Sequence, residues 1–194
     1  MKPPTARAHC DRCLRPQSTC LCGWITPTPT RTDVLILQHP LEVAQAKGSA
    51  RLLHLSLPAS RLLTGETFDP AHLHALLNSD GRVSLLLYPA DAQADAAPRP
   101  PPPADPGLIR LVVLDGTWRK SRKMLHLNPA LGRLPRLALQ APPPSQYRIR
   151  KAHRPEQLST LEATCLALQQ LEGPPTHVNP LLAAFDAFVA SQMR

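Results

Sequence analysis

Aliphatic residues gather in three short runs along the chain, and each run stops at a polar or turn-forming residue. The runs are DVLILQHP at 33–40, RVSLLLYP at 82–89 and LIRLVVLD at 108–115. They lack the alternation of a half-exposed strand, so we predict three strands that are buried on both faces. Pro40 ends the first of them, and a shorter strand is predicted at 135–140.

Three longer segments have the spacing of helices. Their residues are 43–57, 157–172 and 179–193. In the second segment Cys165 lies on an apolar stripe with leucines, which predicts a core residue, and Ser159 with Glu162 fits the capping box that starts a helix. Strands that alternate with helices predict an α/β fold with a parallel sheet covered on both faces.

The length and composition indicate one globular domain with a small appendage. The chain has 194 residues, of which 43% are hydrophobic, and its 24 prolines predict long irregular connections. The segment GWITPTPTRT has the composition of a linker, so we expect a small element in residues 1–30 and the main domain in residues 31–194. The stretch APRPPPPADP is interpreted as a stiff loop in preference to a peptide-docking motif.

The first residues of the chain and its apolar runs indicate the cellular location of the protein. No run approaches the roughly 20 apolar residues of a spanning helix, and the start MKPPTARAHC lacks the apolar centre of a signal peptide. We therefore expect a cytoplasmic protein with no membrane partner, and we expect it to be a monomer.

Four of the five cysteines lie close together near the N-terminus. They are Cys10, Cys13, Cys20 and Cys22, in the pattern C-x2-C-x6-C-x-C. In a reducing compartment such a cluster favours a metal site over a disulfide pair, and four thiolates suit a structural tetrahedral zinc. A redox-active or simply reduced loop is the alternative, and His9 is interpreted as a neighbour of the site, not a ligand.

The charge is strongly positive and unevenly distributed. The formal net charge is +8, which favours a polyanionic partner such as RNA or DNA. Between Arg119 and Arg154 there are ten basic residues and no Asp or Glu. Trp118 and Tyr147 flank these cations and could stack on an unpaired base, although packing of Trp118 into the core is an equal alternative.

In a parallel sheet, ligands collect at the carboxyl ends of the strands. The predicted strands end at Gln38-His39-Pro40, at Tyr88-Pro89 and at Asp115-Gly116-Thr117-Trp118. Asp115 or Thr117 could instead cap a helix that begins near Trp118, and His39 alone is interpreted as structural. A free helix N-terminus would also accept an anionic group such as an amino-acid carboxylate.

Several motifs together resemble those of the DTW-domain family, the tRNA-uridine aminocarboxypropyltransferases. They are HCDRCLRPQSTCLC, LQHPLE, LLLYP, VVLDGTWRKSRKML, SQYRIRK and LSTLEA, in this order. The resemblance implies that S-adenosylmethionine gives its 3-amino-3-carboxypropyl group to N3 of a uridine in tRNA, leaving methylthioadenosine. It also implies a SPOUT-like sheet with a C-terminal trefoil knot. Gly48-Ser49 stands where the family usually has an Asn-Thr pair.

The resemblance, the chemistry of the implied reaction and the charge pattern together give expected roles to individual residues. Asp115 is the expected general base, or the group that orients the imide proton of the uridine, and Gly116 allows a close turn. The full set of expected residues is catalytic Asp115, Thr117 and Trp118; cofactor-binding Tyr88, Pro89, Leu114, Leu139, Ser159 and Thr160; and RNA-binding Arg119, Arg122, Lys123, Arg148, Arg150 and Lys151. A SPOUT-type RNA methyltransferase and a non-catalytic zinc-containing RNA-binding protein are the alternatives.

Overall fold

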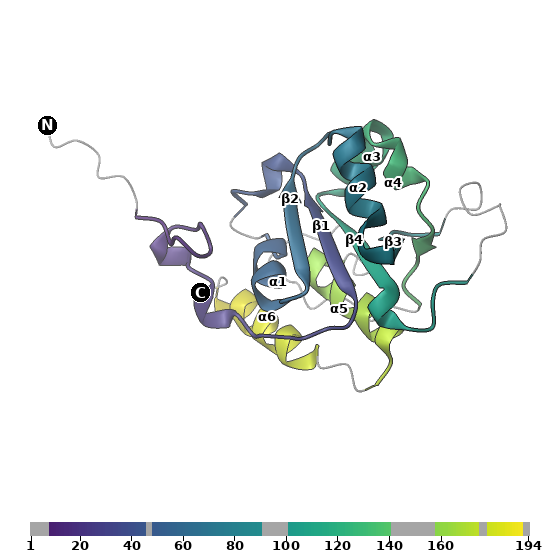
Figure 1. Cartoon of the computed structure of the whole chain (residues 1–194). Helices are drawn as coiled ribbons and strands as arrows, with labels where there is room; N and C mark the ends of the chain where they lie inside the picture. Colours follow the sequence, from purple (N-terminus) through teal and green to yellow (C-terminus); the bar gives the residue numbers. More distant parts are fainter. Residues whose placement is uncertain (1–7, 46–47, 91–100, 141–157, 175–177, 192–194) are drawn as a thin grey trace, which may run out of the picture.

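The three aliphatic runs form the centre of a five-stranded parallel sheet (Figure 1). In the computed structural model, which describes residues 8–45, 48–90, 101–140, 158–174 and 178–191, the strand order is β2-β1-β4-β3-β5. The strands are β1 Asp33–Gln38, β2 Ser60–Thr64, β3 Val83–Leu87, β4 Ile109–Asp115 and β5 Arg136–Leu137. Every pairing is parallel, as the sequence predicted.

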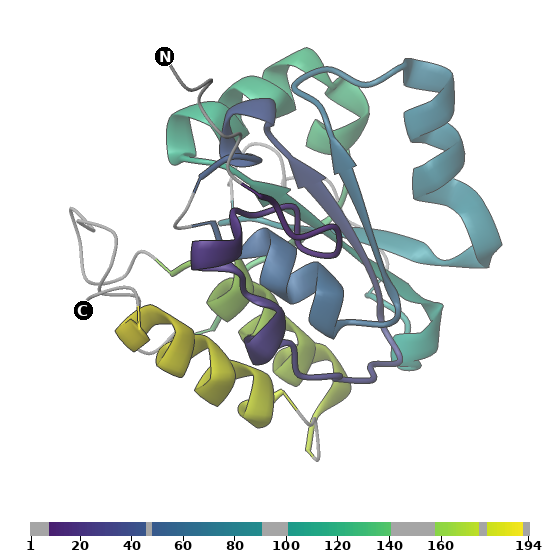
Figure 2. The ribbon, with the colours of Figure 1, turned by 90° about the vertical axis from the view of Figure 1, so that its left-hand side faces the viewer.

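Helices cover both faces of this sheet (Figures 1 and 2). One face carries α1 Ala50–Ser56, α5 Thr160–Glu172 and α6 Asn179–Ser191, and the other carries α2 Pro70–Asn78, α3 Trp118–Leu127 and α4 Pro129–Gly132. Successive residues of β1 point to opposite faces, so Val34 joins the first cluster and Leu35 joins the second. Cys165 is fully buried in the first cluster, which confirms its assignment to the core.

The chain departs from the predicted elements in its second quarter. The helix predicted over 43–57 is wrong in its first half, because α1 begins only at Ala50. A short 3-10 turn at Pro40–Glu42 follows β1, and Ser49 is the N-cap of α1, with its carbonyl accepting from the amide of Leu53. The sequence did not predict β2 or α2.

The two central strands lie at a topological switch point. β1 is followed by α1 on one face, whereas its neighbour β4 is followed by α3 on the other face. Helices that leave adjacent strands in opposite directions open a crevice outside the carboxyl ends of those strands. The register sets Gln38 of β1 beside Asp115 of β4 at this edge.

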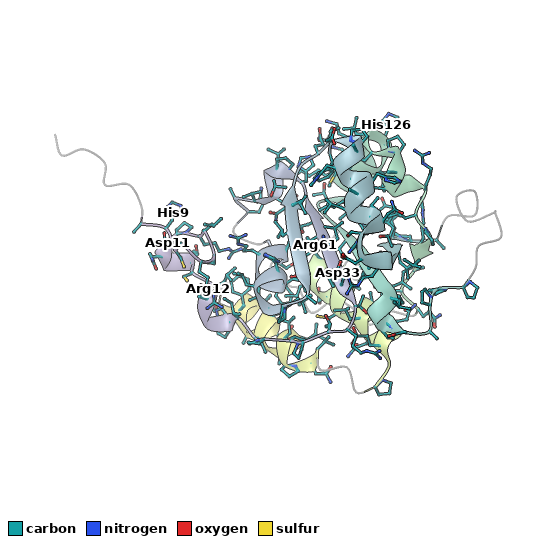
Figure 3. All side chains as sticks on the ribbon, viewed as in Figure 1. His9, Asp11, Arg12, Asp33, Arg61 and His126 are labelled. Atoms are coloured by element: carbon teal, nitrogen blue, oxygen red, sulfur yellow. The ribbon has the colours of Figure 1, made fainter. Side chains whose placement is uncertain are left out.

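The opposite edge of the sheet holds a charge network around a buried arginine. Arg110 is fully buried, and its Nε donates to Asp33 Oδ1 at 2.5 Å while its Nη2 donates to Asp80 at 3.1 Å. Asp33 also accepts from Arg61, its neighbour in Figure 3, at 3.1 Å. Burial raises the pKa of Asp33, but the hydrogen bonds from Arg110 and Arg61 outweigh it and hold that pKa below its usual value.

Two expectations concern the chain as a whole. Residues 141–157, between β5 and α5, lie outside the described residues, and the knot stays a prediction. Within the described segments, every helix is too short or too polar to cross a lipid bilayer.

Candidate active site at the carboxyl edge of the sheet

Asp115 is the last residue of β4 and lies at the centre of the carboxyl edge. Its side chain is only 5% exposed. Oδ2 accepts a hydrogen bond from Gln38 Nε2 at 2.9 Å, and Oδ1 accepts one from Thr160 Oγ1 at 2.6 Å. The backbone carbonyl of Asp115 accepts from the amide of His39 at 2.9 Å. Two distant segments, the end of β1 and the start of α5, therefore hold this carboxylate.

The residues after Asp115 turn the chain sharply into α3. Thr117 is the N-cap of this helix, and its Oγ1 accepts from the amide of Lys120 at 3.4 Å. Capping therefore explains Thr117 but not Asp115. Gly116 packs closely against the helix, since a Cβ atom added to it would lie 3.1 Å from Cβ of Lys120. A glycine suits this close approach.

An aromatic and cationic stack lies beside this turn. The rings of Trp118 and Tyr88 meet edge to face, with centroids 5.5 Å apart, and the guanidinium of Arg136 lies 5.3 Å from the centroid of the Tyr88 ring. Trp118 is 49% exposed, so the alternative that it packs into the core is wrong. A held but half-exposed indole is suited to stacking on a planar ligand.

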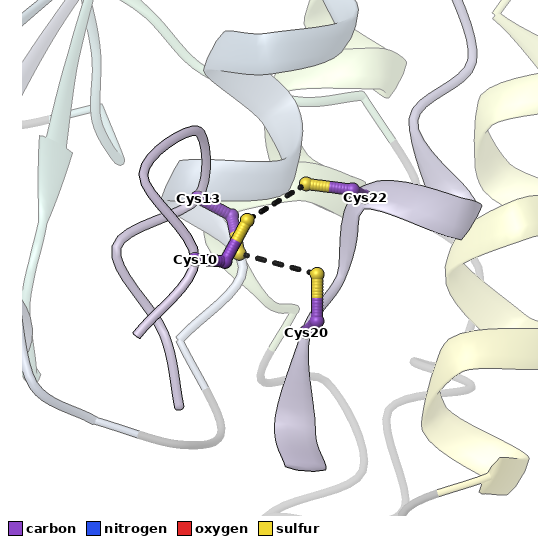
Figure 4. A group of neighbouring side chains, drawn as sticks. All are labelled: Cys10, Cys13, Cys20 and Cys22. Carbon is purple, nitrogen blue, oxygen red and sulfur yellow. Dashed lines mark hydrogen bonds between the residues drawn. The ribbon is translucent and has the colours of Figure 1, made fainter. Parts of the chain in front are cut away.

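The four N-terminal cysteines converge on one point (Figure 4). Their Sγ atoms lie within 4.8 Å of one another, with Cys10 and Cys22 3.6 Å apart and Cys13 and Cys20 3.7 Å apart. Zinc–sulfur bonds of about 2.3 Å in a tetrahedron place the sulfurs about 3.8 Å apart. The donor set and its spacing therefore fit a structural zinc ion.

The thiols of this cluster differ in their affinity for protons. Backbone amides of Cys13 and Arg12 donate to Cys10 and lower its pKa to about 6, whereas burial and the neighbouring thiols raise the pKa of Cys22 to about 12. A bound metal requires thiolates, so metal binding at this cluster would release protons.

Comparison with known proteins identifies the family to which this chain belongs. A family model described as the DTW domain matches residues 7–193. This chain belongs to the DTW-domain family.

Curated relatives of this DTW-domain chain carry the name of one enzyme class. A Drosophila melanogaster protein named tRNA-uridine aminocarboxypropyltransferase 2 is 34% identical over 92% of this chain and 74% of its own length. The Mus musculus protein of that name is 32% identical over 97% of the chain, which spans 64% of the mouse protein. The Arabidopsis thaliana tRNA-uridine aminocarboxypropyltransferase A is 30% identical over 61% of the chain and half of its own length. No solved structure matches the chain significantly.

The cofactor-binding residues expected of the DTW domain are divided between the two layers. Tyr88 and Leu114 pack against the cluster under α3, whereas Leu139 packs against the cluster under α1 and α5. Pro89 accepts from Arg136 through its carbonyl at 3.1 Å. Tyr88 and Pro89 follow the carboxyl end of β3, Leu114 is the next-to-last residue of β4, and Leu139 follows β5.

The start of α5 is committed to internal hydrogen bonds. Ser159 Oγ accepts from the amide of Glu162 at 3.2 Å, and Glu162 accepts from the amide of Ser159 at 2.7 Å, which confirms the capping box. The amide of Leu161 donates to Ser49 Oγ at 3.2 Å. The amides of Leu161 and Glu162 are thus engaged within the DTW domain and are not offered to an anionic ligand.

The cations of α3 are not equivalent. Lys120 donates to the buried carboxylate of Glu42 at 2.8 Å, and Lys123 pairs with Glu66 at 2.9 Å. Hydrogen bonds from Lys123 and from His39 lower the pKa of Glu66. The basic stretch that begins at Arg119 contains no acidic residue, but the fold places Glu42 and Glu66 beside its lysines.

The remaining expected RNA-binding residues fall into two groups. Arg119 and Arg122 are exposed and, within the described part of the chain, make no ion pair. The others lie outside the described residues: Arg148, Arg150 and Lys151.

Two residues of this site were given no role by the sequence. Gln38 was noted only as a polar strand end, and its contact with Asp115 depends on β1 lying beside β4. Ser49 was noted only as a departure from the family pattern, and its contact with Leu161 joins segments 112 residues apart. Neither pairing leaves a local sequence signal.

Proposed function

We propose that this protein transfers the 3-amino-3-carboxypropyl group of S-adenosylmethionine to N3 of a uridine in tRNA and releases methylthioadenosine. The names of the relatives support the reaction class. The observation that carries the proposal is the buried carboxylate of Asp115, held by Gln38 and Thr160 at the switch point of the sheet. Ligands of open α/β sheets bind at this position.

The chemistry requires a group that handles one proton. S-adenosylmethionine supplies an electrophilic carbon bonded to its sulfonium sulfur. N3 of uridine carries a proton, and it can form the new carbon–nitrogen bond only as that proton leaves while the carbon–sulfur bond breaks. Asp115 accepts the imide proton, or orients it for transfer to water, and its negative charge attracts the sulfonium.

The carboxyl edge offers partners for both substrates. The proposed contacts to S-adenosylmethionine are Tyr88, Pro89, Leu114, Leu139, Ser159 and Thr160. The hydroxyl of Thr160 already bonds Asp115, and that of Ser159 belongs to the capping box. Their contacts with S-adenosylmethionine would therefore use backbone atoms, or a hydroxyl that bonds both groups at once. In this proposal Trp118 stacks on a base near the target uridine, and Thr117 holds the helix that carries it.

We further propose that zinc binds Cys10, Cys13, Cys20 and Cys22 and that the domain has a SPOUT-like trefoil knot. The close spacing of the four sulfurs supports the metal. Metal analysis of purified protein should give one zinc per chain, and a double substitution Cys13→Ser, Cys20→Ser should remove it. A full equivalent of zinc in the double mutant would contradict this ligand set.

The decisive experiment follows both products of the proposed reaction. Purified protein is incubated with unmodified tRNA and S-adenosylmethionine labelled in the carboxypropyl carbons, and nucleosides and small molecules are analysed by mass spectrometry. We expect labelled aminocarboxypropyluridine and methylthioadenosine in equal amounts. S-adenosylhomocysteine with a methylated nucleoside would instead identify a methyltransferase. Binding of tRNA without either product would favour a non-catalytic RNA-binding protein.

A further inference from the structure

We propose that Arg15 is a positioning residue through which the cysteine cluster holds the start of α5, and so Asp115, in place. The inference rests on the proposed function for its rate measurement, but its structural part can be tested without any activity. It also gives a role to Gly48-Ser49, the pair that departs from the family pattern.

Arg15 belongs to the turn that carries two of the four cysteines. The amide of Cys10 donates to the carbonyl of Arg15 at 2.8 Å, and the amide of Leu14 donates to the carbonyl of Cys10 at 2.7 Å. A metal bound by Cys10 and Cys13 would therefore fix the backbone from which the Arg15 side chain extends.

The Arg15 side chain leaves this turn and enters the main domain. It is buried, and its Nη2 donates to the carbonyls of Gln45 at 3.3 Å and Gly48 at 3.1 Å. Its guanidinium also lies 5.3 Å from the centroid of the Phe188 ring in α6. A planar guanidinium can bind carbonyls and stack on a ring at the same time, which a lysine cannot do.

The residue after Gly48 continues the path to the active-site edge. Ser49 is buried and accepts from the amide of Leu161 through its Oγ at 3.2 Å. The preceding residue of α5, Thr160, donates to Asp115 at 2.6 Å. The path thus has two hydrogen-bonded steps, from Arg15 to Gly48 and from Ser49 to Leu161, and the peptide unit between Gly48 and Ser49 joins them. Leu161 is the neighbour of Thr160, which holds the Asp115 carboxylate.

Amide hydrogen exchange tests the structural part of this inference. The amides of Leu161 and Leu53 donate to Ser49, so they report on the order of this loop. In zinc-loaded Arg15→Gln protein we expect their exchange, followed by NMR, to be about 2- to 30-fold faster than in wild type. Arg12→Gln is the matched control, because it removes the same charge from an exposed side chain of the same turn (Figure 3). It should leave both amides unchanged.

Removal of zinc provides the second arm of this test. A chelator should speed exchange of Leu161 in wild type and in Arg12→Gln but add little in Arg15→Gln, because the link is already broken. Equal acceleration by the chelator in all three proteins would overturn the inference. So would unchanged exchange in zinc-loaded Arg15→Gln.

The transfer rate tests the consequence for Asp115. At saturating tRNA and S-adenosylmethionine we expect kcat of Arg15→Gln to fall by about 2- to 30-fold, with Arg12→Gln at the wild-type value. Faster exchange of Leu161 with an unchanged kcat would overturn the positioning role. Wild-type protein that transfers nothing would remove the proposed function and leave the exchange result to decide the structural link.

Discussion

Two aspartates lie at opposite ends of neighbouring strands, and each is held by side chains from other segments of the chain. Asp33 begins β1 and is held by the guanidinium groups of Arg110 and Arg61. Asp115 ends β4 and is held by the amide of Gln38 and the hydroxyl of Thr160. Both carboxylates are fixed by more than one hydrogen bond, so the contrast lies in the kind of donor.

The kind of donor decides what each carboxylate can do. Cationic partners cancel the charge of Asp33 and stabilise a buried network, which favours a structural role. Gln38 and Thr160 are neutral donors, so they orient the Asp115 carboxylate but do not themselves cancel its charge, and the proposed function uses that charge on a cationic ligand or a proton.

The largest expected effect is on Asp115. Asp115→Asn keeps the size of the side chain but can neither take a proton nor supply a charge, so we expect transfer to fall by roughly a hundred- to ten-thousand-fold. Single-turnover release of methylthioadenosine at saturating substrates measures this. The unfolding midpoint should stay close to wild type, and near wild-type turnover would remove Asp115 from the mechanism.

The matching substitution at the other end should change stability instead. In Asp33→Asn, Arg110 loses a charged partner, and we expect about 2–3 kcal/mol of destabilisation. This is less than for a fully buried pair, because Asp33 is partly exposed and Asp80 also contacts Arg110. Urea unfolding measures the loss, while kcat of the folded enzyme should be retained.

The pH dependence of that loss has a definite sign. The folded-state pKa of Asp33 is lowered, so its ionised form stabilises the folded protein at neutral pH. This contribution to the free energy of unfolding disappears as the pH falls through that lowered pKa. The stability difference between wild type and Asp33→Asn should therefore shrink below about pH 4. A difference that stays constant down to pH 2.5 would contradict the charge-pair explanation.

A smaller effect is expected when one neutral donor to Asp115 is removed. Thr160→Val keeps the shape of the side chain and deletes the hydroxyl, and a lost hydrogen bond to a charged group of about 1.5–3 kcal/mol corresponds to roughly 10- to 150-fold in kcat. Thr164→Val is the control, since Thr164 lies one turn further along α5 and donates to the carbonyl of Thr160. Equal loss in both variants would indicate damage to the helix in general.

The smallest effect concerns the cations of α3. A double substitution of the exposed Arg119 and Arg122 to Gln should reduce the salt slope of tRNA binding by about 1.4–1.8, or roughly 0.7–0.9 per phosphate contact. The same change at Lys120 and Lys123 should reduce it less, because these lysines are paired with Glu42 and Glu66. A larger change for the lysine pair would reverse this assignment.

The sequence predicted the elements whose signals are local. The aliphatic runs of β1 and β4 predicted buried parallel strands, and the Ser159–Glu162 spacing predicted the start of α5. It missed β2, which is only partly buried along its length, and it placed α1 too early because apolar residues near Val43 continue the helical spacing. The predicted helix ran through Gly48, whereas α1 begins two residues after it, at Ala50.

The sequence likewise predicted only part of the candidate site. Asp115 and the four cysteines stand in recognisable motifs, and the structure buries the first and brings the others together. The partners of Asp115 and of the α3 lysines come from segments tens of residues away. Only the strand order and the path of the loops bring them together, so composition and spacing cannot reveal them.

The strand order also affects how quickly the active edge can form. Gln38 and Asp115 are 77 residues apart in the chain, yet they meet in adjacent strands at the centre of the sheet. A parallel pairing of such high contact order pays its loop-closure entropy before it gains stability, so it forms slowly. During synthesis β1 must wait for β4, and Thr160 is made later still. The carboxyl edge that holds Asp115 is therefore among the last parts of the molecule to assemble during synthesis, after the cysteine cluster has already emerged.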